Sequence, residues 1–306
     1  MDYSFANGVI SALETKVLDR NKLYVLNKYE KDEFVKVLLS MNYGGSGSSL
    51  EELIQLENKR VKEVIDSITP CKKNTDLFYL LNDALNLKVL YKNKLFKINK
   101  ENLMTNTGAI PCDLLKQAII DNNYEGISKD IKNLIIHINN QIDDTTSPKN
   151  LSSIIDNEIY QYALNATNDL ILKKYIQAKI DLSNVISLLR AHNLNWNVND
   201  YLAMFVQGGL IKKDELASIY DQSKEEQIRF LSNYYNELIS KVLAKTSTMN
   251  EYQIDFDRLL IEIMSEHKND PFSIGPMINY YLLKQAEAQN IRILYSLNNV
   301  EIKDLI

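Results

Sequence analysis

The stretch Asp83-Ala84-Leu85-Asn86-Leu87 decides the fold, because its pattern returns twice further along the chain. The pattern is an acid, two residues and an asparagine within an apolar run. It returns as Asp181-Leu182-Ser183-Asn184-Val185 and as Glu287-Ala288-Gln289-Asn290-Ile291. The copies follow one another at intervals of roughly 100 residues, and self-similarity at a fixed period is typical of proteins built from repeated units.

Other features repeat with the same period and in the same order. Gly108-Ala109-Ile110 returns as Gly209-Leu210-Ile211, and an aspartate follows each copy. A polar stretch and another helix that carries an acid follow in each third of the chain; these acids are Glu57, Asp156 and Asp257. Because the patterns agree in period and order, we interpret them as a triplication. We expect the acids of the repeated patterns to cap helices or to pair with basic neighbours.

The composition indicates helices throughout the chain. Only 9 glycines and 5 prolines occur in 306 residues, which is too few for the frequent turns of a sandwich or a barrel. Ser49 and Glu52 form a capping box, which predicts a helix that starts at about Leu50. Apolar residues recur at helical spacing, for example at Leu182, Val185, Ile186 and Leu189. The sequence therefore predicts an all-α fold.

We expect three similar helical domains. The first covers residues 1–75, the second residues 76–172, and the third residues 173–306, including the closing helices at the C-terminal end. A unit of roughly 100 residues is longer than the common short helical repeats of ~34–47 residues, so each copy is a small domain in its own right. Three such domains can take a pseudo-threefold arrangement around a central cavity.

Charge, hydropathy and cysteine content exclude several classes of protein. The net charge is −5, and the chain lacks the dense basic stripe that general nucleic-acid binding requires. No window approaches ~18 uninterrupted apolar residues, and the first residues lack the basic and apolar segments of a signal peptide. The 2 cysteines, Cys71 and Cys112, have neither zinc-site spacing nor the number needed for a disulfide framework. These features favour a reducing, cytosolic setting without membrane insertion.

No pattern of catalytic residues is present. The three histidines, His137, His192 and His267, lack the spacing of zinc or di-iron ligands, and we expect His137 to be an ordinary helix residue. The glycine-rich stretch 44–49 lacks the lysine and the preceding strand of a phosphate-binding loop, so we interpret it as a connector. Cys112 has no evident histidine partner, and we expect a buried structural thiol. The sequence predicts that the protein is not an enzyme and holds no cofactor or metal.

The region from Pro271 to Leu294 contains the most distinctive part of the sequence. It resembles the C-terminal signature of the C subunit of archaeal and bacterial V/A-type rotary ATPases, whose eukaryotic counterpart is the d subunit of the V-ATPase. The matching positions are Pro276, Tyr281, Leu282, Lys284, Glu287, Asn290, Ile291 and Arg292.

The N-terminal region resembles the same family. Tyr3, Asn7 and Glu14 match the family's opening helix, and Asn42-Tyr43 falls where the family has Thr-Tyr. The chain departs from the family at residues 8–9, where Gly and Val stand in place of the usual arginines. Partner contacts made by those arginines are therefore not carried over to this chain.

The resemblance implies a funnel of three helical domains that couples a rotor. In that family the protein sits on the cytoplasmic face of the membrane proteolipid ring (the c or K ring), and the tip of the central stalk, built from D-type and F-type subunits, inserts in its cavity. Torque then passes between the catalytic head and the ring, and the adapter has no catalytic residues. The choice of H⁺ or Na⁺ and the direction of ATP turnover stay open.

Two other functions stay open beside the rotor adapter. A generic helical scaffold outside rotary ATPases would have the same fold and unrelated partners, and an all-helical enzyme would need a carboxylate-rich pocket. For partner contact we select Arg190 and Arg292, since both follow the repeated asparagine on its helix. Salt bridges within a domain are the alternative role of both arginines. Trp196 could anchor a partner or fill a contact within the fold.

Overall fold

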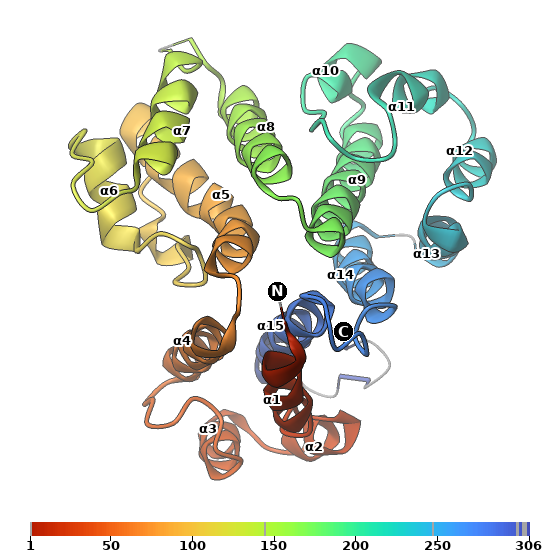
Figure 1. Ribbon diagram of the computed structural model, residues 1–306. Coiled ribbons are helices and arrows are strands. Elements are labelled where there is room, and N and C mark those ends of the chain that lie inside the picture. Colours follow the sequence, from red (N-terminus) through yellow and green to blue (C-terminus); the bar gives the residue numbers. More distant parts are fainter. Residues whose placement is uncertain (1, 144, 247, 298–299, 302–304) are drawn as a thin grey trace. The chain divides into compact units, whose positions relative to one another are not determined.

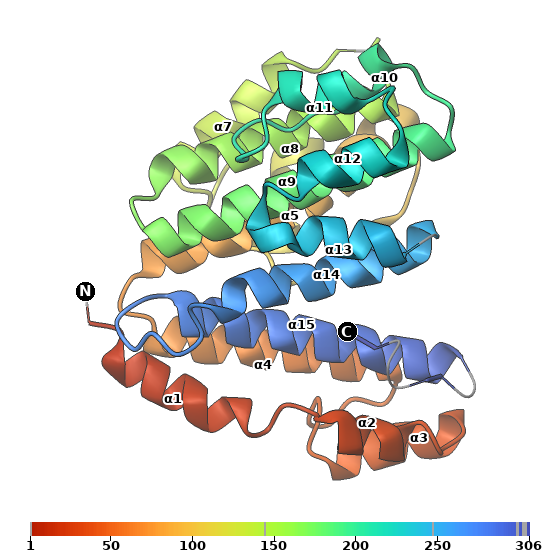
Figure 2. The same ribbon diagram turned by 90° about the vertical axis from the view of Figure 1, so that its right-hand side faces the viewer.

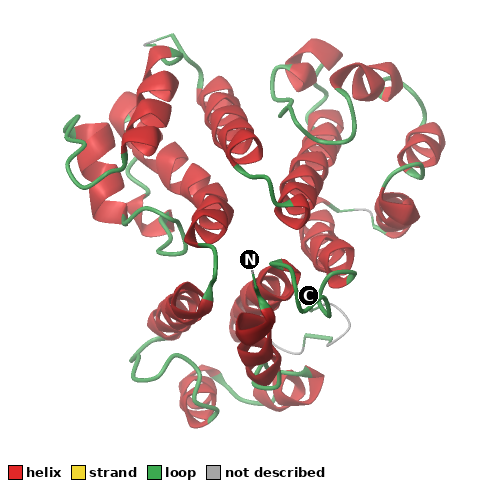
Figure 3. Cartoon of the chain, viewed as in Figure 1, coloured by secondary structure: helices red, strands yellow, loops and turns green. Residues whose placement is uncertain are grey.

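The computed structural model describes residues 2–143, 145–246, 248–297, 300–301 and 305–306. Within these ranges the chain forms fifteen α-helices and two short 3₁₀ turns, and no strand is present (Figure 3). The predicted all-α fold is therefore confirmed. The predicted helix start is confirmed: the fourth helix begins at Leu50, and the Ser49 side chain accepts a hydrogen bond from the Glu52 backbone. The Glu52 carboxylate accepts from the backbone and the hydroxyl of Ser48, one residue before the predicted capping-box partner.

The chain divides into two compact units. Unit 1 joins residues 1–72 to residues 253–306, and unit 2 consists of residues 73–252. The helices of unit 1 are α1 (Ser4–Glu14), α2 (Arg20–Leu26), α3 (Lys31–Ser40), α4 (Leu50–Ile68), nearly all of α14 (Met249–Ser265), and α15 (Gly275–Ser296). Segments from both ends of the sequence thus build one unit. The division into three similar domains stays a prediction.

Unit 2 is built from a continuous stretch of chain. Its helices are α5 (Lys72–Phe96), α6 (Cys112–Ile120), α7 (Lys129–Asn140), α8 (Pro148–Ala166), α9 (Leu170–Asn193), α10 (Val198–Leu202), α11 (Lys213–Ile219), α12 (Lys224–Leu231) and α13 (Leu238–Lys245). Helix α8 packs against α7 and α9, and α10 packs against α9 and α11 (Figures 1 and 2). The long helices α5 and α9 carry the first two copies of the repeated acid-x-x-Asn pattern.

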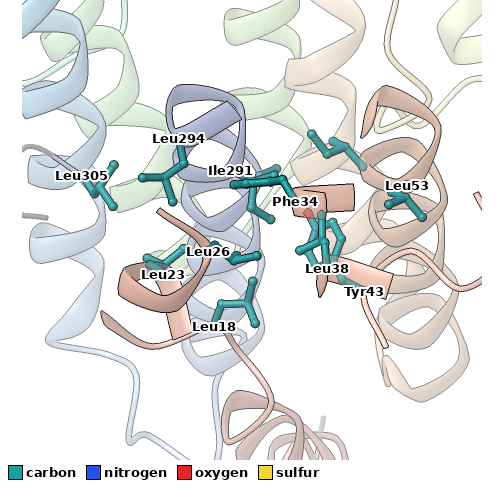
Figure 4. Packing of buried hydrophobic residues seen from close by; sticks show 12 residues of the cluster. Leu18, Leu23, Leu26, Phe34, Leu38, Tyr43, Leu53, Ile291, Leu294 and Leu305 are labelled. Carbon is teal, nitrogen blue, oxygen red and sulfur yellow. The ribbon is translucent and has the colours of Figure 1, made fainter. Parts of the chain in front are cut away.

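The core of unit 1 forms around α15. This helix packs against α1, α2 and α4. Apolar side chains from the N-terminal helices meet Ile291 and Leu294 of α15 in one buried cluster (Figure 4). The other members of the cluster are Leu18, Leu23, Leu26, Phe34, Leu38, Tyr43, Leu53, Ile54, Ala288 and Leu305. Full burial of each large apolar side chain contributes about 1.5–3 kcal/mol, so α15 is the main support of the N-terminal helices.

The long helices begin at side chains suited to capping. Ser147 caps α8 by accepting from the Asn150 backbone, and Pro148 occupies the first helical turn. Asp169 caps α9 by accepting from the backbone N–H groups of Ile171 and Leu172. A serine or aspartate at this position satisfies N–H groups that have no partner inside the helix. Local sequence therefore fixes where these helices start.

Candidate functional site

The acid and asparagine of each repeated pattern are buried, although their side chains are polar. Their exposed fractions lie between 0% and 3%. They are Asp83 and Asn86 on α5, Asp181 and Asn184 on α9, and Glu287 and Asn290 on α15. Buried polar groups are costly unless they are paired, so their partners explain why the pattern repeats.

Each asparagine holds one backbone residue through two hydrogen bonds. Asn86 donates to the carbonyl of Thr105 at 2.9 Å and accepts from its N–H at 2.8 Å. Asn184 makes the same pair of bonds with Val206, at 2.8 and 2.9 Å. Asn290 does so with Ile306, at 2.9 and 2.7 Å. The side-chain amide thus satisfies a backbone donor and a backbone acceptor together.

Each acid also accepts backbone N–H groups; in the first two copies they come from the loop that the asparagine holds, and in the third from a separate segment. Asp83 accepts from Ala109 and Ile110 at 2.7 and 3.2 Å. Asp181 accepts from Leu210 and Ile211 at 2.8 and 3.1 Å. In the third copy Glu287 accepts from Leu18 at 2.6 Å. We call each acid-asparagine pair, together with the backbone residues that it holds, a polar clamp.

The repeated glycines belong to the first two polar clamps. A Cβ atom at Gly108 would lie 1.9 Å from Oδ1 of Asp83, and one at Gly209 would lie 2.0 Å from Oδ1 of Asp181. No side chain fits there without movement of the carboxylate. The glycine pattern and the acid-x-x-Asn pattern are therefore two halves of one device, a link that the sequence did not reveal.

The third polar clamp takes its partners from both ends of the sequence. Glu287 holds Leu18, just before α2, whereas Asn290 holds Ile306. Lys284, one turn earlier on α15, forms ion pairs with Glu287 and with Glu57 of α4; its Nζ atom lies 2.8 Å from Oε1 of Glu57. The expectation that a repeated acid pairs with a basic neighbour is confirmed for Glu287.

Burial sets the protonation of these acids. Desolvation raises the pKa of Glu287, although the ion pair with Lys284 opposes the shift. Desolvation likewise raises the pKa of Asp181 to about 6, while the hydrogen bonds from the hydroxyl of Tyr235 and from the N–H groups of Leu210 and Ile211 act against it. The Tyr235 hydroxyl donates to Asp181 at 2.6 Å. These contacts lie inside the packed units, where they hold the fold.

The two arginines selected for partner contact have different surroundings. Arg292 forms a two-pronged ion pair with Glu51 of α4, at 2.5 and 3.2 Å, and both side chains are about half exposed. This ion pair lies within unit 1, although it joins the first and the third of the predicted domains. Arg190 is exposed near the end of α9, and within the part of the chain that the structure describes its guanidinium has no ion pair. Partner contact by either residue stays a proposal.

The other residues considered for chemistry have structural surroundings. The imidazole of His137 is largely exposed and lies 3.4 Å from Glu158. The ring of His192 stacks on Tyr220 with centroids 4.6 Å apart. Cys112 is half-buried, not fully buried as expected, since it lies at the surface edge of the first polar clamp. Burial raises the pKa of its thiol, which lowers its reactivity.

Trp196 contributes to packing within unit 2. Lys149, in the first turn of α8, places its ammonium 3.9 Å from the centroid of the indole ring. The Trp196 carbonyl accepts from the Tyr220 hydroxyl at 2.7 Å. The residue therefore fills an internal contact, which was one of the two roles considered.

Residues of α1 that match the family's opening helix form hydrogen bonds with α15 and with the segment that precedes it. The amide of Asn7 donates to the carbonyls of Pro271 and Ser273 at 3.0 and 2.9 Å, and Asn279 donates to Glu14 at 3.4 Å. Tyr3 is buried. These bonds join α1 to α15 and to the segment before it within unit 1.

Among the described residues, no three His, Cys, Asp or Glu side chains gather as metal ligands would. In the same residues, every helix is too short or too polar to cross a bilayer. The polar side chains singled out by the repeats serve instead to hold backbone segments. Fold and clamps together define an all-helical protein whose long helices α5, α9 and α15 each hold backbone residues through a buried polar clamp.

Comparison with known proteins gives this class a family. The model of the ATP synthase (C/AC39) subunit family matches residues 6–297, so the chain belongs to that family. It is 23% identical to the C subunit of the A-type ATP synthase of Thermococcus kodakarensis, over 96% of this chain and 86% of that protein. It is also 23% identical to the corresponding A-type ATP synthase protein from Desulfurococcus sp., over 99% of this chain and 90% of that protein.

A shorter match has higher identity. The C subunit of the A-type ATP synthase of Archaeoglobus fulgidus is 28% identical over 136 residues, which are 42% of this chain and 39% of that protein. This alignment therefore covers less than half the length of that relative. The predicted resemblance to the C subunit of V/A-type ATPases is confirmed at the level of the family.

Proposed function

We propose that this protein is a non-catalytic adapter in the rotor of a V/A-type ATPase. It receives the central stalk, formed by D-type and F-type subunits, and rests on the proteolipid ring at the cytoplasmic face of the membrane. Torque passes through it between ring and catalytic head, which links ion transport to ATP hydrolysis or synthesis. The observation that carries the proposal is the family match over residues 6–297.

The internal bracing supports a mechanical role. A part that transmits torque must resist deformation. Helices α5 and α9 each fix a loop through a buried polar clamp, and α15 fixes two separate segments. Hydrogen bonds in a dry environment are costly to break without replacement. The polar side chains that could have served chemistry are used for this bracing.

Exposed side chains offer contacts for partners. Phe5 on α1 and Phe272 in the segment before α15 are 74% and 71% exposed, and the bonds from Asn7 to that segment join it to α1. Leu170, at the start of α9 in unit 2, is 78% exposed. Aromatic residues such as phenylalanine are enriched at protein interfaces. Arg190 and Arg292 add charges that can pair with acidic groups on the stalk or the ring.

Co-purification tests this function. A tagged chain, expressed in membranes that contain the other ATPase subunits, is expected to bring down the stalk subunits and the proteolipid ring, and the isolated chain is expected to show no ATPase activity. Crosslinks from engineered cysteines are expected to connect both units to the stalk. Recovery of neither partner would refute the adapter and favour a scaffold outside rotary ATPases.

A further inference from the structure

A pocket of about 280 Å³ opens in unit 1 between the segment that follows α1, the turn after α3, and the helices α4 and α15. Its apolar wall includes Leu13, Val17 and Val61, and its aromatic residues are Tyr43 and Tyr280. All of its lining residues belong to unit 1 and to the described part of the chain. The volume is close to the lower end of small-molecule sites, which are about 300–1,000 Å³.

Positive charge dominates the lining. Four cationic residues, Lys16, Lys22, Arg60 and Lys284, face a single acid, Glu57. Within the described residues, Lys16 and Lys22 have no ion pair, and Arg60 has only a long contact of 3.7 Å with Glu57. Lys16, Lys22 and Arg60 can therefore pair with an anionic ligand.

The acid in the pocket is already engaged. One oxygen of Glu57 lies 2.8 Å from the ammonium of Lys284, and the other accepts from the backbone of Gly44 at 3.2 Å. Lys284 in turn binds Glu287 behind the pocket. Lys284 carries one positive charge against the two carboxylates of Glu57 and Glu287, so this buried group adds no positive charge to the pocket. The positive charge that a ligand meets comes from Lys16, Lys22 and Arg60.

We propose that this pocket binds a small phosphate ester. The phosphoryl group lies among Lys16, Lys22 and Arg60, and the organic part lies against the apolar wall and Tyr43. Lysine and arginine are the usual partners of phosphate in proteins, and an apolar wall with few convergent polar groups is typical of small-ligand sites. The inference stands on the geometry of unit 1 alone and does not depend on the rotor function.

Calorimetric titration of the full chain with AMP tests the proposal. We expect saturable one-to-one binding, which the double variant Lys16→Ala/Lys22→Ala weakens at least tenfold. The double variant Lys28→Ala/Lys36→Ala is the matched control, because it removes the same charge from unit 1 outside the pocket lining. This control is expected to bind AMP as the unchanged chain does.

Three results would overturn the proposal. The first is the absence of saturable AMP binding to a chain with unchanged helical circular dichroism. The second is an equal loss of binding in both double variants, which would indicate a general effect of charge. The third is equal binding of sulfate or pyrophosphate at the same ionic strength, which would indicate an adventitious anion without a role for the wall. If the double variant Lys16→Arg/Lys22→Arg, which keeps both charges, binds AMP as tightly as the unchanged chain, the result would support the site.

Discussion

At the scale of single residues, Gly209 is decisive because the carboxylate of Asp181 occupies the space beside it. A methyl group there would lie 2.0 Å from a carboxylate oxygen, so Gly209→Ala must displace Asp181 or the loop. We expect a loss of about 2–4 kcal/mol in unfolding free energy, the range for disruption of a buried hydrogen-bonded network. Urea unfolding followed by circular dichroism measures it.

Gly8 is the matched control for that substitution. It lies within α1, and a Cβ atom there would meet nothing within 4 Å. Gly8→Ala is expected to stabilise the protein by about 0.5–1 kcal/mol, since alanine loses less conformational freedom in a helix. Similar destabilisation by both substitutions would contradict the role of the polar clamp.

The raised pKa of Asp181 predicts a dependence of stability on pH. In the folded chain its pKa is about 6, compared with a usual value of 3.8, so the folded state takes up this proton first as pH falls. Its contribution to stability therefore rises as pH falls from about 7 to about 4, by at most about 3 kcal/mol. Stability at pH 7 is lower by that amount than it would be with a neutral side chain.

Asp181→Asn isolates this effect from the other titrating groups, including Glu287. The variant keeps an acceptor for the loop and has no proton to exchange. The difference in urea midpoint between the unchanged chain and the variant is expected to favour the unchanged chain increasingly as pH falls from about 7 to about 4. A difference that does not change with pH would show that Asp181 has an ordinary pKa.

The sequence predicted the residues of the polar clamps but not their partners. Period and spacing identified Asp83, Asn86 and their later copies, and also the glycines. Asp83 binds the loop that contains Gly108 through a contact with Ala109, which is 26 residues away in the sequence. No local sequence pattern shows this contact. The contact of Glu287 with Leu18 is longer still, at 269 residues. Local rules thus identify unusual residues, whereas packing decides what they touch.

At the scale of elements, α15 is the helix on which unit 1 depends. Its Lys284 is 4% exposed and neutralises acids from α4 and from its own next turn. Lys284→Met keeps most of the volume but leaves two buried acids without their cation. We expect a loss of about 3–5 kcal/mol at neutral pH, the usual result of removing one partner of a buried pair.

A compensating variant makes this prediction specific. Lys284→Met combined with Glu57→Gln and Glu287→Gln removes the uncompensated charges, and it is expected to recover part of the lost stability. Thermal unfolding at two pH values provides the measurement, because protonation of the acids at low pH should reduce the penalty of Lys284→Met alone. No recovery in the triple variant would mean that Lys284 acts through packing.

Helix starts and helix faces were the elements most open to prediction. Ser49 and the apolar spacing of α9 act within a few residues, and the structure confirms both. The assembly of unit 1 from both ends of the sequence was not predicted, because periodicity carries no information on which copies of a repeat pack together. The N-terminal and C-terminal matches to the family lie far apart in the sequence, which does not show that they are in contact. In the structure Asn7 joins the two regions directly.

At the scale of the whole molecule, unit 2 is continuous in sequence and unit 1 is not. We expect a fragment of residues 73–252 to fold alone, with helical circular dichroism and cooperative unfolding. A fragment of residues 1–72 is expected to stay largely unfolded until residues 253–306 are added, because its buried cluster is completed by side chains of α15. Cooperative folding of residues 1–72 alone would contradict this division.

The proposed partner contacts are also tested on the whole molecule. Arg190→Ala is expected to change stability by less than about 0.5 kcal/mol, because the residue is exposed, and to reduce recovery of the stalk or the ring. Arg292→Ala also removes the exposed pair with Glu51, with a stability cost of at most about 1 kcal/mol. Unchanged partner recovery with both variants would leave Arg292 as a brace within unit 1.

The origin of unit 1 in two distant segments has a consequence for synthesis on the ribosome. Helices α1–α4 emerge first, yet α15, which buries their apolar faces, begins at Gly275, 207 residues after α4 ends at Ile68 and after the whole of unit 2. At a translation rate of about 5–20 residues per second, the apolar faces of α1–α4 stay exposed for roughly 10–40 s. During that interval the nascent chain exposes apolar surface of the kind that chaperones bind. We therefore expect the yield of folded protein to depend on chaperone binding to α1–α4 during translation.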